Sequence, residues 1–120
     1  MSELSQAVSI NPYFKVHEGQ MEKARGLMRR MVSNTTPEEA CLYYDFSING
    51  DEVFCREAYI DAEGLLTHIS RVQPILEEFL QIADVTRIEL HGPAAELEKL
   101  KGPMADLNPA YFVHECGVVR

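Results

Sequence analysis

Glu57 and His68 have the side-chain types that most often move protons in enzymes, and they lie in one short stretch of the chain. A glutamate among apolar neighbours has a raised pKa and can act as a general base, while histidine changes charge near neutral pH. In the segment EVFCREAYI, alternation puts Glu57 on one strand face with Val53, Cys55 and Tyr59. These residues predict a pocket for acid–base chemistry.

Both residues also have a plainer interpretation. A glutamate on a sheet can bind a neighbouring backbone amide, or pair with an arginine such as Arg71. A histidine in the position of His68 can be a half-exposed helix residue with no catalytic role. The sequence leaves both interpretations open for Glu57 and His68.

A strand that leads directly into a helix must position this pair. Residues 52–60 are rich in β-forming types, and Asp61 then offers an N-cap, with Glu63 in the first turn where the helix dipole favours negative charge. The apolar residues that follow have helical spacing: Leu65, Ile69, Val72 and Leu76. Residues 71–83, with Pro74 near their start, predict a second, kinked helical piece.

A hairpin is predicted just before this strand, because Asn49-Gly50 is the strongest two-residue turn signal in the chain. Residues 40–48 alternate as a strand and would form its first arm. With Asn49 and Gly50 as the loop, the predicted pairs are Ile48 with Asp51, Tyr44 with Cys55, and Leu42 with Glu57. Glu57 would then lie among the apolar side chains of two strands.

The remaining pattern completes an α+β architecture. Strands are predicted at residues 8–16, 84–90 and 111–119, and helices at residues 20–34 and 94–101. The order strand, helix, strand, strand, helix, strand is a ferredoxin-like βαββαβ unit, an antiparallel sheet with both main helices on one face. A short helix and a strand follow it. The sheet face without helices predicts a homodimer, in which two such faces pack together.

Composition narrows the class of protein. A chain of 120 residues predicts a single domain, residues 1–120, with a core of about residues 8–92 and an extension at 93–120. The net charge of -8 disfavours binding to nucleic acid or to anionic membranes. No basic leader or long apolar run is present, so we expect a cytoplasmic protein.

Cysteine and histidine usage predicts neither disulfides nor a metal site. The three cysteines include no CxxC pair, which indicates reduced thiols that pack as small hydrophobic side chains. The four histidines show no HxH or HxxxH spacing. They are His17, His68, His91 and His114.

Several residues together resemble the antibiotic biosynthesis monooxygenase family, small ferredoxin-like proteins that dimerise through their sheets into an α+β barrel. They span about two-thirds of the chain, residues 11–90. Tyr59 stands where the family commonly has tryptophan, and the helix and strand after residue 93 lie outside the minimal family pattern. The residues that carry the resemblance are Lys15, Gly19, Tyr44-Asp45, Phe54, Glu57, Tyr59, Asp61, Leu65-Leu66 and His68.

The resemblance implies oxygen-dependent oxidation of a phenolic or quinol-like small molecule without a metal or flavin. Glu57 would then be the base, His68 would donate or accept a proton, and Tyr44 and Tyr59 would stack on the substrate ring. A haem-degrading branch of the superfamily uses an asparagine, a tryptophan and a histidine. Asn11 and His68 match two of these but the chain has no tryptophan, so Asn11 is kept only as a substrate-binding candidate.

A second function is compatible with the same fold, because fold alone does not determine activity. In this alternative the chain is a non-enzymatic or isomerase-like homodimer whose pocket binds a small hydrophobic metabolite. Oxygen consumption would distinguish the two.

Overall fold

The computed structural model describes residues 5–120, so residues 1–4 of the predicted domain lie outside the described part of the chain. The elements follow the predicted order with small changes of boundary. They are β1 (Val8–Val16), α1 (Met21–Thr35), β2 (Cys41–Asn49), β3 (Glu52–Tyr59), α2 (Ala62–Phe79), β4 (Ala83–Gly92), α3 (Ala94–Leu100), the 3-10 turn η1 (Ala105–Leu107) and β5 (Ala110–Val113).

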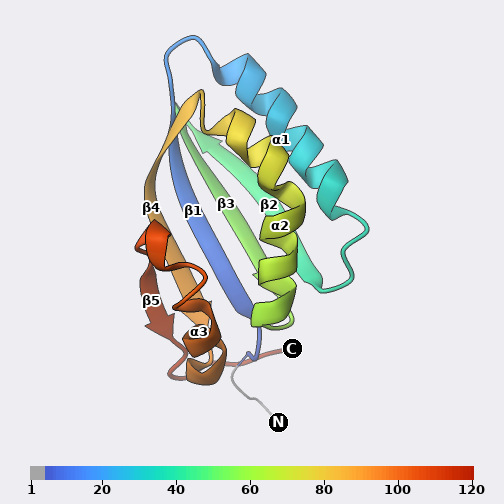
Figure 1. Cartoon of the computed structure of the whole chain (residues 1–120), viewed down its shortest axis with the longest axis vertical. Helices are drawn as coiled ribbons and strands as arrows, with labels where there is room; N and C mark the ends of the chain where they lie inside the picture. Colours follow the sequence, from blue (N-terminus) through green and yellow to red (C-terminus); the bar gives the residue numbers. More distant parts are fainter. Residues whose placement is uncertain (1–4) are drawn as a thin grey trace.

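The strands form one sheet in the order β2-β3-β1-β4-β5 (Figure 1). The first four pair antiparallel, whereas β5 pairs with β4 in parallel. In Figure 1, α1 and α2 lie on the same face of the sheet, and α3 lies beside β4 and β5. The predicted ferredoxin-like α+β fold with an added helix and strand is therefore confirmed.

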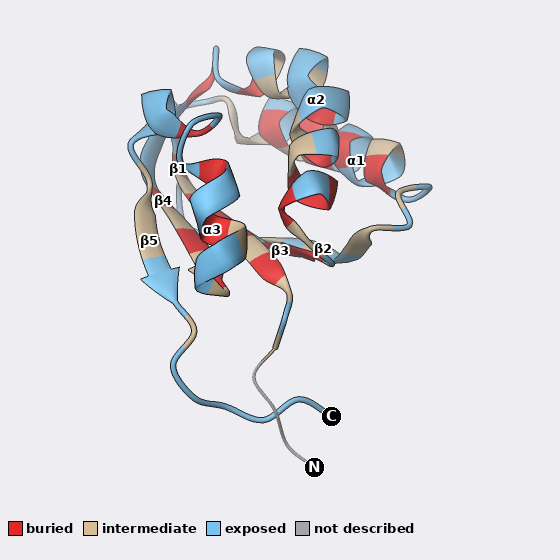
Figure 2. Ribbon diagram, turned by 60° about the horizontal axis from the view of Figure 1, so that its bottom comes forward, coloured by how far each residue is buried: buried red, intermediate tan, exposed pale blue. Residues whose placement is uncertain are grey.

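Two hydrophobic clusters join the helices to the sheet, and Figure 2 shows the buried residues gathered where the helices face the strands. The first lies between α1, the later part of α2 and the sheet, and it includes Met31, Phe14 and Phe79. The second lies beneath α3 and the start of α2, and it includes Leu97 and Tyr59. Because α2 runs over both clusters, it also crosses the space between them.

The hairpin register differs from the predicted one by two residues. Asn49 pairs with Glu52, so Gly50 and Asp51 form the loop, and Tyr44 lies opposite Glu57. Gly50 has φ 64°, and a glycine with positive φ at the first loop position is typical of a type II′ turn. A shift of two preserves the period-two alternation, so Glu57 stays on the predicted face.

A bulge at the start of β2 corrects the predicted position of Leu42. The register of β2 against β3 shifts between Cys41 and Tyr43, and Leu42 is 52% exposed and has no partner on β3. Cys41 instead packs against the second hydrophobic cluster. An extra residue in one strand turns the side chains on either side of it, which accounts for the exchange.

Two other boundaries were predicted wrongly. α2 is continuous through Pro74, where two helical pieces were predicted. Pro74 is exposed, so water can hydrate the carbonyl group that loses its helical hydrogen bond. β5 ends at Val113, well before the predicted end at residue 119, although the amide of His114 still donates to the Gly92 carbonyl.

Gly64, near the start of α2, is a close-packed position that tests this description. A Cβ at Gly64 would lie 2.8 Å from the Ala40 Cβ, whereas a Cβ at Gly26 in α1 would meet nothing within 4 Å. We expect Gly64→Ala to lower the free energy of unfolding by about 1–3 kcal/mol, because overpacking outweighs the helix gain. Gly26→Ala, the control, should raise it by about 0.5–1 kcal/mol. Urea unfolding of both variants measures this, and equal stabilisation of the two would contradict the packing.

Candidate functional site

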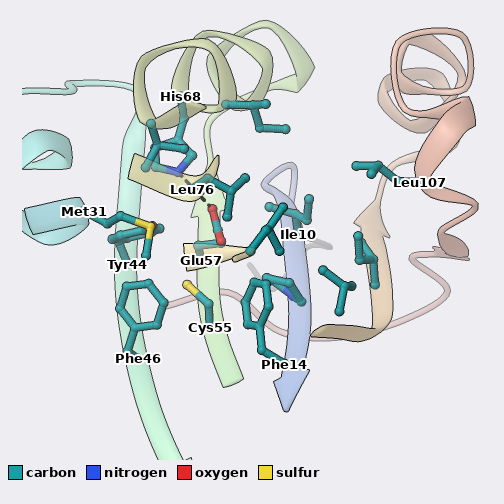
Figure 3. A pocket seen from close by; sticks show the side chains of 16 residues that line it. Ile10, Phe14, Met31, Tyr44, Phe46, Cys55, Glu57, His68, Leu76 and Leu107 are labelled. Atoms are coloured by element: carbon teal, nitrogen blue, oxygen red, sulfur yellow. Dashed lines mark ion pairs between the residues drawn. The ribbon is translucent and has the colours of Figure 1, made fainter. Parts of the chain in front are cut away.

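A pocket lies under α2, between the two hydrophobic clusters (Figure 3). Its cavity volume is about 100 Å³. Most of the lining is apolar and comes from the central strands, from α2 and from β2: Ile10, Phe14, Tyr44, Phe46, Ile69, Val72, Leu76 and Ile88. Among the lining residues, only Glu57 and His68 have side chains that are charged or change charge near neutral pH.

Glu57 reaches the pocket from the helix-facing side of β3, where alternation places it, and it is only 5% exposed. The Tyr59 hydroxyl donates to its Oε1 at 2.5 Å, and the Cys55 thiol donates to the same carboxylate. Burial raises the pKa of Glu57 to about 7, although these two hydrogen bonds oppose the shift. Glu57 can therefore gain and lose a proton near neutral pH.

His68 comes from α2, about two turns after the Asp61 cap, whose side chain fixes the helix start by accepting from the Gly64 amide. Its Nε2 lies 3.4 Å from Glu57 Oε1, the ion pair marked in Figure 3. The imidazole is 2% exposed and lies between the rings of Tyr44 and Tyr59, at centroid distances of 4.8 and 5.0 Å. Burial lowers the pKa of His68, and the nearby Glu38 carboxylate opposes that shift.

Glu38, in the loop between α1 and β2, is a member of this cluster that the sequence did not reveal. Its Oε2 lies 3.2 Å from His68 Nδ1 and 3.5 Å from Arg71 Nε. The Glu38 side chain is only 5% exposed. An acidic residue after Thr-Pro in a turn ordinarily faces solvent, so only the folded chain shows that Glu38 lies beside His68.

The plainer interpretations of the pair differ from what the structure contains. Arg71 was a possible partner for Glu57, but its guanidinium contacts Glu38 and the carbonyl of Asn34. His68 was a possible half-exposed helix residue, but it is buried. The structure therefore brings Glu57 and His68 together inside the protein, in contact with each other and with the same pocket.

Of the other predicted site residues, Tyr44, Tyr59 and Asn11, only Tyr44 lines the pocket. Tyr44 lines the pocket opposite Glu57 on the neighbouring strand. Tyr59 is fully buried and is not among the lining residues; its hydroxyl binds the Glu57 carboxylate. The structure does not bring Asn11 to the pocket: its side-chain amide donates to Ser9 Oγ, and its neighbour Ile10 lines the pocket instead.

The rim of the pocket contains exposed hydrophobic side chains. Leu80, Val85 and Leu107 all line the pocket and are 41%, 41% and 50% exposed. In Figure 3, Leu107 projects from the C-terminal segment on the side of the pocket away from His68. An apolar molecule could contact these three residues with one end while its other end reaches the acidic and imidazole groups.

Two kinds of feature are absent from residues 5–120. No three or more His, Cys, Asp or Glu side chains are grouped there in a way that could hold a metal ion. Within the same range, none of the helices combines the length and the hydropathy that crossing a bilayer requires.

Matches to known proteins come only from the comparison with solved structures. No protein-family model matches this sequence, and a search of curated proteins found no match either. Among solved structures, an antibiotic biosynthesis monooxygenase is 18% identical, with a TM-score of 0.64 over 69% of this chain and 94% of its own. A variant of SnoaB, a cofactor-independent oxygenase from Streptomyces nogalater, is 10% identical, with a TM-score of 0.63 over 71% of this chain and 90% of its own. Both share the fold.

MupZ from Pseudomonas fluorescens is much more similar. Its crystal structure superposes with a TM-score of 0.92 at 37% sequence identity. The alignment covers 96% of this chain and 95% of MupZ, so it extends over the C-terminal helix and strand, whereas the two monooxygenase-fold matches cover 69% and 71% of this chain. The chain therefore belongs to the same family as MupZ, among the proteins with the antibiotic biosynthesis monooxygenase fold.

Proposed function

We propose that this protein is an enzyme in which Glu57 and His68 move a proton to or from a small, largely apolar molecule. The observation that carries the proposal is a buried carboxyl and a buried imidazole, 3.4 Å apart, at one side of an otherwise apolar pocket. Such groups are costly to bury, and catalytic sites are where proteins most often retain them. The reaction that we favour is cofactor-independent oxidation of a phenol or quinol by oxygen.

In this reaction the ionised Glu57 accepts the phenolic proton, and the phenolate that forms is a better electron donor. Oxygen is the oxidant: a quinol gives two electrons and two protons to O₂, which yields quinone and hydrogen peroxide. If a methylene group of the substrate ring is oxidised instead, one oxygen atom of O₂ converts the CH₂ group to C=O and the other leaves as water. Since the pKa of Glu57 is about 7, a substantial fraction of Glu57 is ionised at neutral pH while it remains basic enough to take a proton.

The size of the pocket limits the substrate. A volume of about 100 Å³ is below the several hundred Å³ typical of pockets that enclose a drug-sized ligand. One ring or one chain end can enter, with the rest of the molecule against the rim residues Leu80, Val85 and Leu107. Tyr44, whose ring lines the pocket opposite Glu57, is the residue best placed to contact a substrate ring.

An isomerase-like reaction is the second candidate, and one feature of the pocket lining supports it. The aliphatic residues outnumber the aromatic ones, and the polar groups present are those that proton transfer needs. Such an enzyme would exchange substrate protons with solvent without consuming oxygen. Incorporation of deuterium from D₂O with no oxygen uptake identifies this case.

Replacing either member of the pair should abolish the activity. With 1,4-naphthoquinol as the probe, we expect Glu57→Gln and His68→Gln to lower oxygen uptake above the uncatalysed rate by about 10²–10⁴-fold, because the proton acceptor is lost. The control is Glu63→Gln, which changes an exposed residue of α2, the helix that contains His68, and it should keep the wild-type rate. An oxygen electrode measures the rates, and circular dichroism checks folding. Full activity of Glu57→Gln, or no oxygen uptake by the wild type with any quinol or phenol tried, contradicts the oxidation.

We further propose that the protein is a homodimer formed through the sheet face opposite the helices. No helix of residues 5–120 packs on that face (Figure 1). Aromatic side chains cross it: Tyr13 and Phe54 lie 4.7 Å apart between ring centroids, and Phe112 stacks on His91 at 4.7 Å. Arg56 lies over the Tyr43 ring on the same side. A mixed aromatic and charged surface of this kind is typical of protein interfaces.

The dimer proposal predicts a sedimenting mass of twice 13.6 kDa at micromolar concentration. Phe54→Glu should shift the protein to monomer, because it places a charge at the centre of the contact. Val32→Glu, which changes an exposed residue of α1, is the control and should stay dimeric. Sedimentation velocity on the three proteins makes the measurement, and a wild-type protein that sediments as a monomer overturns the proposal.

A further inference from the structure

We propose that Glu38 is a positioning residue. It accepts a hydrogen bond from the Nδ1–H group of His68, which turns the Nε2 lone pair toward Glu57. A proton taken up by Glu57 can then pass on to His68. This deepens the proposed function and rests on it. Glu38 is not among the residues that line the pocket, so it would act through His68 and not on the substrate.

The three side chains form a continuous chain across the site. Glu38 Oε2 lies 3.2 Å from His68 Nδ1, and His68 Nε2 lies 3.4 Å from Glu57 Oε1. All three side chains are nearly excluded from water, with exposures of 5%, 2% and 6% for Glu38, His68 and Glu57. At such burial the electrostatic effect of one group on the next is strong, because little solvent screens it.

The proton positions follow from the donors and acceptors available. A neutral imidazole has one N–H, and an ionised carboxylate can only accept a hydrogen bond. When Glu57 holds a proton it can donate to Nε2, so the ring proton lies on Nδ1, where the Glu38 carboxylate accepts it. Nε2 is then an acceptor facing Glu57. When His68 takes a second proton, it donates to a carboxylate on each side, and the Glu38 charge stabilises the imidazolium.

Glu38 is itself held in place by the chain around it. Its amide donates to the Thr35 carbonyl, and its own carbonyl accepts from the Cys41 amide. Arg71 contacts the Glu38 carboxylate at 3.5 Å and donates to the Asn34 carbonyl at 3.1 Å. These contacts fix the loop against α2, as an orienting residue requires.

Other groups around the imidazole change the pKa of His68 or face its ring. Arg71, one turn further along α2, lowers the pKa of His68, whereas Glu38 raises it. Tyr44 from β2 and Tyr59 from β3 face the ring. Burial raises the pKa of both tyrosines and of the nearby thiols Cys41 and Cys55, so these four stay protonated near neutral pH. The groups left to exchange the proton are Glu57 and His68.

The test is the protonation state of the His68 ring nitrogens, read by long-range ¹H–¹⁵N NMR of the full chain at pH 6.5, below the Glu57 pKa of about 7, where Glu57 can donate to Nε2. In the wild type we expect Nδ1 protonated and Nε2 unprotonated. In Glu38→Gln we expect a mixture of tautomers and a lower His68 pKa, because the negative charge is lost. Glu39→Gln, the exposed neighbour, is the matched control and should match the wild type. Glu38→Asp should keep the Nδ1 proton.

Activity with 1,4-naphthoquinol completes the test. Glu38→Gln should lower the rate at least about tenfold, and Glu38→Asp should restore part of it. An unchanged His68 tautomer in folded Glu38→Gln overturns the proposal, and so does an altered tautomer with an unchanged rate. Failure of the proposed function has a different signature: Glu57→Gln then keeps the wild-type rate, whatever the tautomer of His68.

Discussion

The burial of a glutamate beside a histidine is the constraint on which the rest of this structure depends. An ionisable side chain removed from water is costly unless neighbours satisfy it, and Glu57 has partners on several sides. Tyr59 and Cys55 donate to its carboxylate, and His68 lies within reach from the helix above. The strand, the helix cap and the close packing of Gly64 against Ala40 together hold these partners next to the Glu57 carboxyl group.

The division of the core explains why this pair lies beside an open space. One hydrophobic cluster joins α1 and the later part of α2 to the sheet, and the other joins α3 and the start of α2 to it. Ile10 and Ile88 of one cluster and Phe14 and Val72 of the other line the pocket between them. The C-terminal extension therefore has a structural role at the site, since α3 builds the second cluster and Leu107 forms part of the rim.

Local patterns predicted the elements and the face on which Glu57 lies. Alternation along β3 is unaffected by a register shift of two, so the orientation of Glu57 was correct even though the loop was Gly50-Asp51 and not Asn49-Gly50. The Asp61 cap was also visible, because a helix N-terminus has a short-range signature. These features depend on residues close together in the chain.

Features that depend on distant contacts were not predicted. Glu38 joins the site through a loop that packs on α2, and its surrounding sequence resembles an ordinary exposed turn. The bulge that turns Leu42 outward depends on how β2 meets β3 in the folded sheet. The continuity of α2 through Pro74 depends on the exposure of that residue in the folded protein. Alternation put Tyr59 on the same strand face as Glu57, and the family resemblance implied that its ring stacks on a substrate. The packed structure instead places Tyr59 outside the pocket lining, as a hydrogen-bond donor to Glu57.

The titration of the Glu57 carboxyl, followed by ¹³C NMR and assigned with Glu57→Gln, tests the central claim most directly. Since burial raises the pKa of Glu57 to about 7, the carboxyl resonance should shift with a midpoint near pH 7. A midpoint near pH 4.5, the ordinary value for a glutamate, would show a hydrated carboxylate. It would contradict a buried proton-transfer site.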